Sequence, residues 1–129
     1  MKLTPVLIVE EIESSLPFWV DRMGFQNVAS VPEGDRLGFV MLIHNGAELM
    51  LQSVASVQKD EPKFAPKSLA PNVGIFVEVD DFQDAVKRLE GYPITMPVRD
   101  TFYGMREIGV FAPSGHTVVF AVKIQTPQQ

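Results

Sequence analysis

Few residues in this sequence carry side chains that could perform chemistry by themselves. The chain has two histidines, His44 and His116, and its composition contains no cysteine. A sequence without cysteine excludes disulfides, thiolate catalysis and zinc–sulfur sites. Each histidine stands beside a predicted hairpin turn, where side chains point to solvent, so we expect both to be solvated. We therefore assign no catalytic residue from the sequence.

A second polar group lies in the stretch Tyr103-Gly104-Met105-Arg106-Glu107. Arg106 and Glu107 could fix the polar end of a ligand, or they could form an exposed ion pair of the kind that contributes little stability. The aromatic rings of Phe39, Phe102 and Tyr103 could stack on a flat ligand ring. Both interpretations of the Arg–Glu pair remain open from the sequence.

The elements that must position these residues begin with a strand and a helix. The apolar run at 6–9 predicts a strand buried on both faces. We expect the helix to be capped by Ser14 or Ser15, with Pro17 in its first turn, and to end at Gly24. The apolar residues of this helix recur at helical spacing and predict one buried face: Ile12, Leu16, Trp19, Val20 and Met23.

Strands and turns follow this helix. Residues 31–35 predict a turn, residues 37–43 and 48–53 predict strands, and Asn45-Gly46 predicts a tight hairpin between those strands. The stretch 53–71 contains three prolines and three lysines without a regular period, and it predicts a connecting loop.

The pattern then repeats. Residues 73–79 predict a strand and residues 82–89 a helix, and three landmarks of the first half recur in order at offsets between 67 and 70. These offsets indicate an internal duplication of a βαβββ module. The predicted organisation is a first module at 1–53, a connecting loop at 54–71, a second module at 72–124 and a tail at 125–129. Each module alone has too little core, so we expect one structural domain overall.

This repeat resembles the vicinal oxygen chelate superfamily, which includes glyoxalase I, extradiol dioxygenases and the bleomycin resistance proteins. The motifs that carry the resemblance run in the family's order: Val9, Glu11, Ile12, Ser15, Leu16, Phe18 and Trp19, then Val79–Asp81, Tyr103–Glu107 and Ala112–His116. The stretch 18–25 looks most like the bleomycin resistance proteins. The resemblance implies an α+β fold in which two βαβββ modules form a curled mixed sheet around a cleft, with the helices outside.

The enzymes of this superfamily hold a divalent metal in the cleft. Counted from the motifs, their ligand positions correspond to Thr4, Met50, Gly74 and Val119, with Gln52 on the same face if the count shifts by two. A catalytic divalent metal needs about three protein oxygen or nitrogen donors. We therefore expect no metal and no other cofactor.

Strand alternation combined with the resemblance predicts that Glu48, Met50, Gln52, Phe76, Glu78 and Val119 face the cleft. The strand edge that the family places beside the cleft adds Tyr103, Arg106 and Glu107, and possible ring stacking adds Phe39. The predicted ligand-binding set is Phe39, Glu48, Met50, Gln52, Phe76, Glu78, Tyr103, Arg106, Glu107 and Val119. This lining favours a metal-independent protein that binds an amphipathic or cationic, antibiotic-like small molecule by sequestration. The alternatives are a metal-dependent lyase, isomerase or dioxygenase with displaced ligands, an interaction protein without a ligand, and side chains that merely fill a second core.

Charge and hydropathy bear on partners and location. The net charge of −5 argues against nucleic acid and anionic membranes. The longest apolar runs fall short of the ~18 residues that span a bilayer, and the beginning of the sequence does not resemble a signal peptide. We expect a cytoplasmic protein, and from the resemblance and the frequency of twofold assemblies we expect a homodimer.

Overall fold

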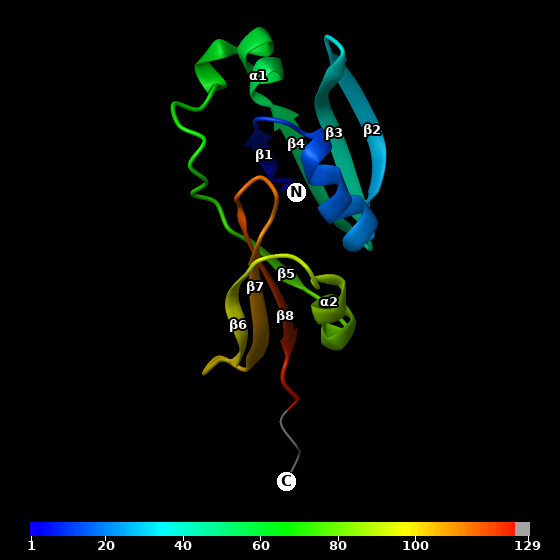
Figure 1. The fold of residues 1–129 in the computed structure, drawn as a ribbon, viewed down its shortest axis with the longest axis vertical. Helices are drawn as coiled ribbons and strands as arrows, with labels where there is room; N and C mark the ends of the chain where they lie inside the picture. Colours follow the sequence, from blue (N-terminus) through cyan, green and yellow to red (C-terminus); the bar gives the residue numbers. More distant parts are fainter. Residues whose placement is uncertain (126–129) are drawn as a thin grey trace. The chain divides into compact units, whose positions relative to one another are not determined.

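A computed structural model describes residues 1–125 of the chain, and residues 126–129, most of the predicted tail, lie outside the described residues. Contacts group the chain into one unit at Met1–Ala70 and another that begins at Pro71. Each unit contains one four-stranded sheet that mixes parallel and antiparallel pairs, with a helical segment after its first strand (Figure 1). This confirms the α+β fold of two repeated modules.

The first sheet has the strand order β1-β4-β3-β2. Its strands are β1 (Val6–Val9), β2 (Gln26–Glu33), β3 (Arg36–His44) and β4 (Ala47–Ser53), and β1 pairs with β4 in parallel while the other pairs are antiparallel. The β3–β4 hairpin turns at Asn45 and Gly46, whose φ angles are 47° and 86°. These left-handed conformations are the ones that an Asn-Gly turn adopts, so the predicted hairpin is confirmed.

The helical segment of the first unit differs from the predicted regular helix. It consists of a 3-10 turn, η1 (Glu13–Ser15), and a π-helix, η2 (Pro17–Arg22), and no side chain caps either of them. The predicted serine caps are therefore wrong: the Ser14 hydroxyl donates to the Glu11 carbonyl, and Ser15 is buried. Pro17 does lie in the first turn, and the chain leaves the segment at Gly24 with a φ of 82°.

The π-helix also changes which residues face the core. Trp19 is buried, as its spacing predicted, but so is Phe18, which lies outside the predicted apolar face. A wider turn places successive residues differently from a turn of 3.6 residues, so both rings reach the interior. They pack edge to face with their centroids 5.0 Å apart.

Strand β1 is buried on one face rather than on two as predicted. Leu7 and Val9 are 3% exposed, whereas Val6 is 45% exposed and Ile8 is half-buried. The alternating side chains of β3 and β4 show the same asymmetry, with Val40, Leu42, Leu49 and Leu51 buried. Phe18 and Trp19 of the helical segment contribute to this buried core.

The predicted connecting loop is helical in its first part, so the loop prediction is wrong there. Helix α1 (Val54–Asp60) begins directly after β4, and a 3-10 turn, η3 (Pro62–Phe64), follows it. The Ser53 hydroxyl caps α1 by accepting from the Ser56 amide at 3.1 Å. A local serine cap starts this helix where composition alone indicated a loop.

The second sheet repeats the topology in the order β5-β8-β7-β6. Its elements are β5 (Ile75–Glu78), α2 (Phe82–Arg88), β6 (Ile94–Asp100), β7 (Met105–Phe111) and β8 (Thr117–Lys123). The Asp81 carboxylate caps α2 by accepting from the Asp84 amide at 3.0 Å. The core of this unit includes the buried residues Phe82, Ala85, Leu89, Ile108, Val110, Val118 and Phe120, and α2 contacts β8.

Strands β2 and β6 each form one edge of their sheet, with β1 and β5 at the other edges, and β2 and β6 are largely exposed. Each has two register irregularities and contains a proline, Pro32 or Pro97. An edge strand tolerates proline because one side of it makes no ladder hydrogen bonds. Strand β2 therefore runs through the predicted turn at 31–35, and the chain turns only at Gly34 and Asp35.

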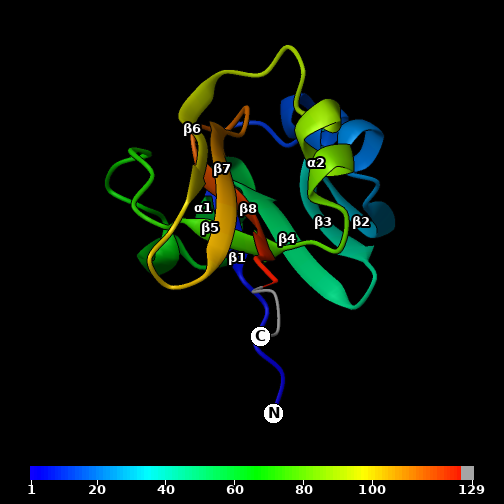
Figure 2. The ribbon, with the colours of Figure 1, turned by 90° about the horizontal axis from the view of Figure 1, so that it is seen from below.

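Figure 2 gives a second view of the elements within each unit. No helix among residues 1–125 is both long enough and apolar enough to span a bilayer.

Candidate functional site

Each sheet has one face opposite its buried apolar core, which we call its helix-free face. In the first unit, Ser56 of helix α1 meets the edge of this face at Gln52. On the first sheet this face is formed by alternate residues of β1, β4 and β3: Val6, Ile8, Glu48, Met50, Gln52, Phe39, Met41 and Ile43. The register sets Phe39 opposite Gln52, and Met41 opposite Met50. Side chains of directly opposed residues lie on the same face within contact range.

Four residues of the predicted ligand-binding set meet on this face: Phe39, Glu48, Met50 and Gln52. All four are half-buried. The sequence prediction omitted Met41, which lies between two members of the set in the register, although the alternation of β3 was sufficient to find it. The ligand-binding role of these residues stays a prediction.

The polar groups of the first face already have intramolecular partners. Glu48 forms an ion pair with Lys2 and accepts a hydrogen bond from the Thr4 hydroxyl at 3.2 Å. The hydrogen bond from Lys2 holds the pKa of Glu48 below its ordinary value. The Gln52 side-chain NH₂ donates to the Ser56 hydroxyl at 3.1 Å. Glu48 therefore does not present an uncompensated charge, and the Gln52 carbonyl oxygen is the amide atom best placed to meet a ligand.

The helix-free face of the second sheet is organised in two rows that cross its four strands. One row consists of Phe76, Val119, Gly109 and Met96. The other row consists of Glu78, Ala121, Glu107 and Arg99. Of the predicted set, Phe76, Glu78, Val119 and Glu107 thus share one face.

Glycine is required at one position of the first of these rows. A Cβ at Gly109 would lie 2.9 Å from the Cβ of Met96 and 3.3 Å from the Thr95 hydroxyl oxygen. Strand β6 therefore approaches β7 more closely there than a side chain would allow. Met96 fills the space beside Gly109, because its Cε would lie 3.6 Å from a Cβ at that position.

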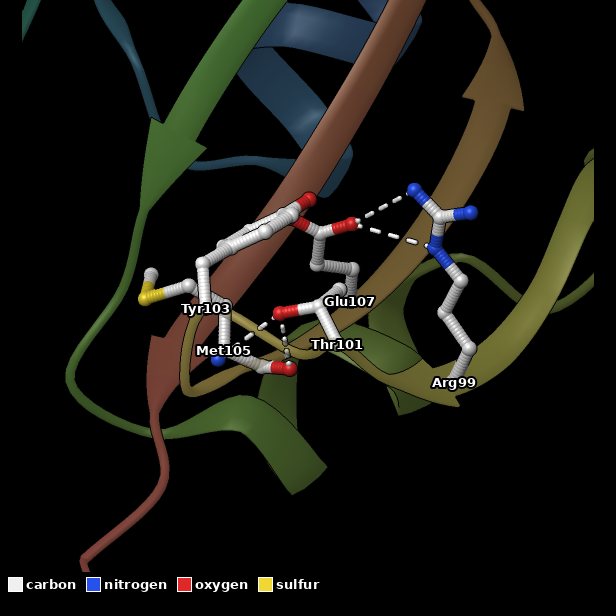
Figure 3. Close-up of polar contacts among 5 residues, drawn as sticks. All are labelled: Arg99, Thr101, Tyr103, Met105 and Glu107. Atoms are coloured by element: carbon white, nitrogen blue, oxygen red, sulfur yellow. Dashed lines mark hydrogen bonds and ion pairs between the residues drawn. The ribbon is translucent and has the colours of Figure 1, made fainter.

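Glu107 is the centre of a polar cluster in the second row (Figure 3). Its side chain is 2% exposed, and Arg99 donates to Oε1 through Nε at 3.2 Å and through Nη2 at 3.1 Å. The Tyr103 hydroxyl donates to Oε2 at 2.7 Å. Hydrogen bonding to Glu107 raises the pKa of Arg99 above its ordinary value. Both carboxylate oxygens are thus occupied, which fixes the guanidinium and the phenol on either side of Glu107.

Arg106 does not pair with Glu107, so of the two interpretations left open by the sequence, the exposed Arg106–Glu107 ion pair is wrong. Consecutive residues of a strand point to opposite faces, and Arg106 instead pairs with Asp100, with Nε 2.7 Å from Oδ1. These bonds lower the pKa of Asp100. The sequence prediction missed Arg99, and the signal that could have found it is its place opposite Glu107 in a β6–β7 hairpin.

The β6–β7 turn holds the aromatic part of this cluster. The Thr101 hydroxyl accepts from the Met105 amide at 3.0 Å, and the Thr101 amide donates to the Met105 carbonyl at 2.8 Å. Tyr103 is 51% exposed and Phe102 is 99% exposed, and their rings meet edge to face with centroids 5.1 Å apart. Phe102 and Tyr103 are therefore available for stacking, whereas Phe39 belongs to the other unit.

The two histidines have different environments. His44 is exposed, as predicted, and its ring lies against Phe25. His116 is only 7% exposed, so the prediction that it is solvated is wrong. Its Nδ1 lies 2.8 Å from the Ser114 hydroxyl, and burial lowers its pKa. A turn that folds back on itself can bury a side chain that its position in the sequence suggests is free.

The residues present do not fit a superfamily metal. Thr4 donates its hydroxyl proton to Glu48, and Met50, Gly74 and Val119 have no side-chain oxygen or nitrogen. Within residues 1–125, no group of three or more His, Asp or Glu side chains is arranged to hold a metal ion. We derive no chemical step through a metal.

The sequence matches the family model of the Glyoxalase/Bleomycin resistance protein/Dioxygenase superfamily over residues 3–120. The chain therefore belongs to this superfamily. No curated protein matches it.

Solved structures support the same fold. A glyoxalase/bleomycin resistance protein/dioxygenase from Nocardioides is 18% identical, with a TM-score of 0.73 over 100% of this chain and 89% of that one. A superfamily member from Sphaerobacter thermophilus is 22% identical, with a TM-score of 0.73 over 95% and 97%. A lactoylglutathione lyase from Agrobacterium tumefaciens is 15% identical, with a TM-score of 0.74 over 95% and 92%. At these identities the similarity establishes the fold and not the activity.

Proposed function

We propose that this protein binds an amphipathic, neutral-to-cationic small molecule without a metal, and that it acts by sequestering that molecule. The observation that carries the proposal is the helix-free face of the first sheet. There Phe39, Met41 and Met50 lie around the Gln52 amide, while the superfamily's ligand positions supply no donor set. An apolar surface with a few placed polar groups is typical of small-molecule sites.

The preference for a cationic group is proposed for a separate surface, the helix-free face of the second sheet. Glu78 is exposed, and none of the ion pairs or hydrogen bonds found within residues 1–125 involves its carboxylate. Phe76 lies two residues away on the same face and is 55% exposed. A carboxylate beside an aromatic ring suits a ligand that has both a cation and an apolar body.

A thermal-shift screen with cationic aromatic compounds tests the proposal. A ligand that binds only the folded chain at a hundred times its Kd stabilises it by about 2.7 kcal/mol, which raises Tm. We expect Phe39→Ala to reduce the shift of a ligand that binds the first sheet, and Phe76→Ala to reduce that of a ligand that binds the second. Phe64→Ala is the matched control, because Phe64 is 73% exposed in η3 and lies outside both helix-free faces.

The dependence of binding on salt separates the electrostatic contribution of Glu78 from the apolar contribution of Phe76. The Debye length falls from about 10 Å at 0.1 M to about 3 Å at 1 M, so Glu78→Gln should weaken cation binding mainly at low salt. Phe76→Ala should weaken it at every salt concentration. Asp80→Asn is the control, since Asp80 is an exposed acid just beyond β5.

The result that would overturn this proposal is a stoichiometric, tightly bound divalent metal together with turnover of a substrate. Metal analysis after purification without chelator, followed by Zn²⁺ or Ni²⁺ titration calorimetry, would reveal it. A metal-dependent lyase, isomerase or dioxygenase would then replace sequestration.

The proposal also includes a cytoplasmic location and a homodimer, since twofold assemblies are the commonest among soluble oligomers. Light scattering at micromolar protein concentration measures whether the homodimer forms. A monomer at that concentration would contradict the dimer without affecting ligand binding by a single chain.

A further inference from the structure

The segment that precedes β1 continues along the neighbouring strand β4. The Met50 amide donates to the Pro5 carbonyl at 3.0 Å, one residue before the parallel pairing of Val6 with Met50 begins. Since alternate residues of an extended chain share a face, Thr4 lies on the helix-free face with Val6, and its hydroxyl bonds to Glu48 on β4. The sheet therefore holds this segment beside the residues of its helix-free face.

Glu48 accepts two donors of this segment with one oxygen atom. The Lys2 ammonium pairs with Oε2, and the Thr4 hydroxyl donates to the same oxygen at 3.2 Å. The Glu48 side chain is 18% exposed, whereas that of Lys2 is 70% exposed. The sheet thus fixes the carboxylate, while the lysine reaches it from solvent on a long side chain with many rotamers. Glu48 and Thr4 together form a position that already holds a primary ammonium group.

An apolar surface adjoins this position. Ile43 lies opposite Glu48 in the β3–β4 register, and Met41 lies opposite Met50, two residues further along β4. Ile43, Met41 and Met50 are half-buried. Two residues of a strand span about 7 Å. A ligand whose ammonium group lies about that far from its apolar body can pair with Glu48 and cover Met50 at the same time.

We propose that Glu48 and Thr4 form an ammonium-binding position on the first sheet, and that Lys2 occupies it and competes with ligands. The ligand class is a primary amine that carries an apolar body. This inference rests on the proposed binding function and adds to it a cation position on the first sheet and an internal competitor for that position. The affinity for an amine is lowered by the fraction of molecules in which Lys2 holds Glu48, whereas a neutral ligand of the same shape loses nothing.

Two probes of the same shape separate the charge from the apolar contact. They are ω-phenylbutylamine and ω-phenylbutanol, which differ only in their ammonium and hydroxyl groups. Binding is followed by NMR of chains labelled at the methionine methyl groups, where the signals of Met41 and Met50 report on the first sheet and are assigned with Met41→Leu and Met50→Leu. Every chain also carries Glu78→Gln, which removes the exposed carboxylate of the second sheet from the comparison.

Lys2→Gln should raise the affinity for phenylbutylamine about threefold to fivefold, the upper range for a partly exposed ion pair, and leave that for phenylbutanol unchanged. Adding Glu48→Gln to this variant should remove both the gain and the preference for the amine. Lys59→Gln is the matched control. Lys59 is 79% exposed and pairs with Glu33, which is 20% exposed, so its replacement breaks a similar ion pair and changes the net charge equally.

The outcomes separate this inference from the proposed function. If Lys2→Gln leaves the amine affinity unchanged while both probes shift the Met41 and Met50 signals, the competition is wrong and binding at the first sheet stands. An equal gain for the alcohol would show that Lys2 only covers apolar surface, and an equal gain in Lys59→Gln would show an effect of net charge; either result overturns the inference. If neither probe shifts these signals in any chain, the first-sheet site of the proposed function fails, and the inference fails with it.

Discussion

In the first module, the row that crosses β1, β4, β3 and β2 consists of Ile8, Gln52, Phe39 and Val31. The corresponding row of the second module consists of Glu78, Ala121, Glu107 and Arg99. The buried faces of the two sheets remain apolar, with Leu42 and Leu51 in one and Ile108 and Phe120 in the other. The buried faces of the two modules thus share apolar character, whereas their helix-free faces differ in charge.

The largest effect that this comparison predicts is at Arg99. Arg99→Ala leaves the buried Glu107 carboxylate without its cation, and Tm should fall on the order of 10 °C. Replacing Glu107 by Gln in the same chain should restore most of the loss, because the stranded charge is then gone. Differential scanning calorimetry measures both variants.

Arg106→Ala is the control for this prediction, because its partner Asp100 is half-exposed and can be solvated by water. We expect a change in the free energy of unfolding within about 0.5 kcal/mol. An equal loss of Tm in the Arg99 and Arg106 variants would show that burial of Glu107 does not set the stability of the pair.

The next largest effect on stability should come from placing a residue type of the second module's row at the equivalent position of the first module. Phe39→Glu gives the first row the acid of the second row but no cation opposite it, because Val31 occupies the corresponding position. The free energy of unfolding should fall by about 1–3 kcal/mol. Adding Val31→Arg should recover part of that loss. Urea unfolding of the single and double variants measures the coupling, and additive losses would contradict the equivalence of the rows.

Tyr103→Phe should have a smaller effect. It removes the hydrogen bond to Glu107 Oε2, but Tyr103 is half-exposed and water can reach the vacated position. We expect a loss of about 1 kcal/mol, measured by urea unfolding. Phe102→Ala, at the fully exposed neighbouring residue, should change stability by less than about 0.5 kcal/mol. If both variants lost the same amount, aromatic contact rather than the hydrogen bond would explain the effect.

The smallest predicted effect concerns the hydrogen bond that joins η1 to strand β3 through Glu13. Glu13 accepts a hydrogen bond from the Leu37 amide at 2.9 Å, which lowers the pKa of its carboxyl. A carboxyl with a lowered folded-state pKa contributes stability above its unfolded pKa of about 4.3, and this contribution is lost as pH falls through the lower folded-state value. Glu13→Gln should therefore flatten the acid limb of the Tm–pH curve below about pH 5. Glu10→Gln, at an exposed acid, should leave that limb unchanged.

Much of the fold followed from local patterns that the sequence makes visible. The Asn45-Gly46 turn, the helix at 82–89 and the repeated βαβββ order depend on turn chemistry and periodicity, and the structure contains all of them. The π-helix and helix α1 did not follow, since the first arises from a wider hydrogen-bonding register and the second from one serine cap. Neither feature leaves a periodic signal.

The candidate site was predicted in the same uneven way. Alternation placed Glu48, Met50 and Gln52 on one face because the period of a strand is two. It could not assign the partner of Glu107, since that partner depends on the pairing register between β6 and β7, which contains two irregularities. Arg99 could therefore be assigned as the partner of Glu107 only from the pairing of β6 with β7 in the structure.

The irregular edge strands have a consequence for how this protein behaves at high concentration. Strands β2 and β6 combine register breaks with Pro32 and Pro97, so their outer rows of amides and carbonyls form a poor template for another strand. Exposed Val28, Val31, Ile94 and Val98 would otherwise make these strands prone to β-aggregation. The interruptions keep two β-rich edges from seeding amyloid-like stacking of identical chains, and they leave both sheets free to carry apolar residues on their exposed faces.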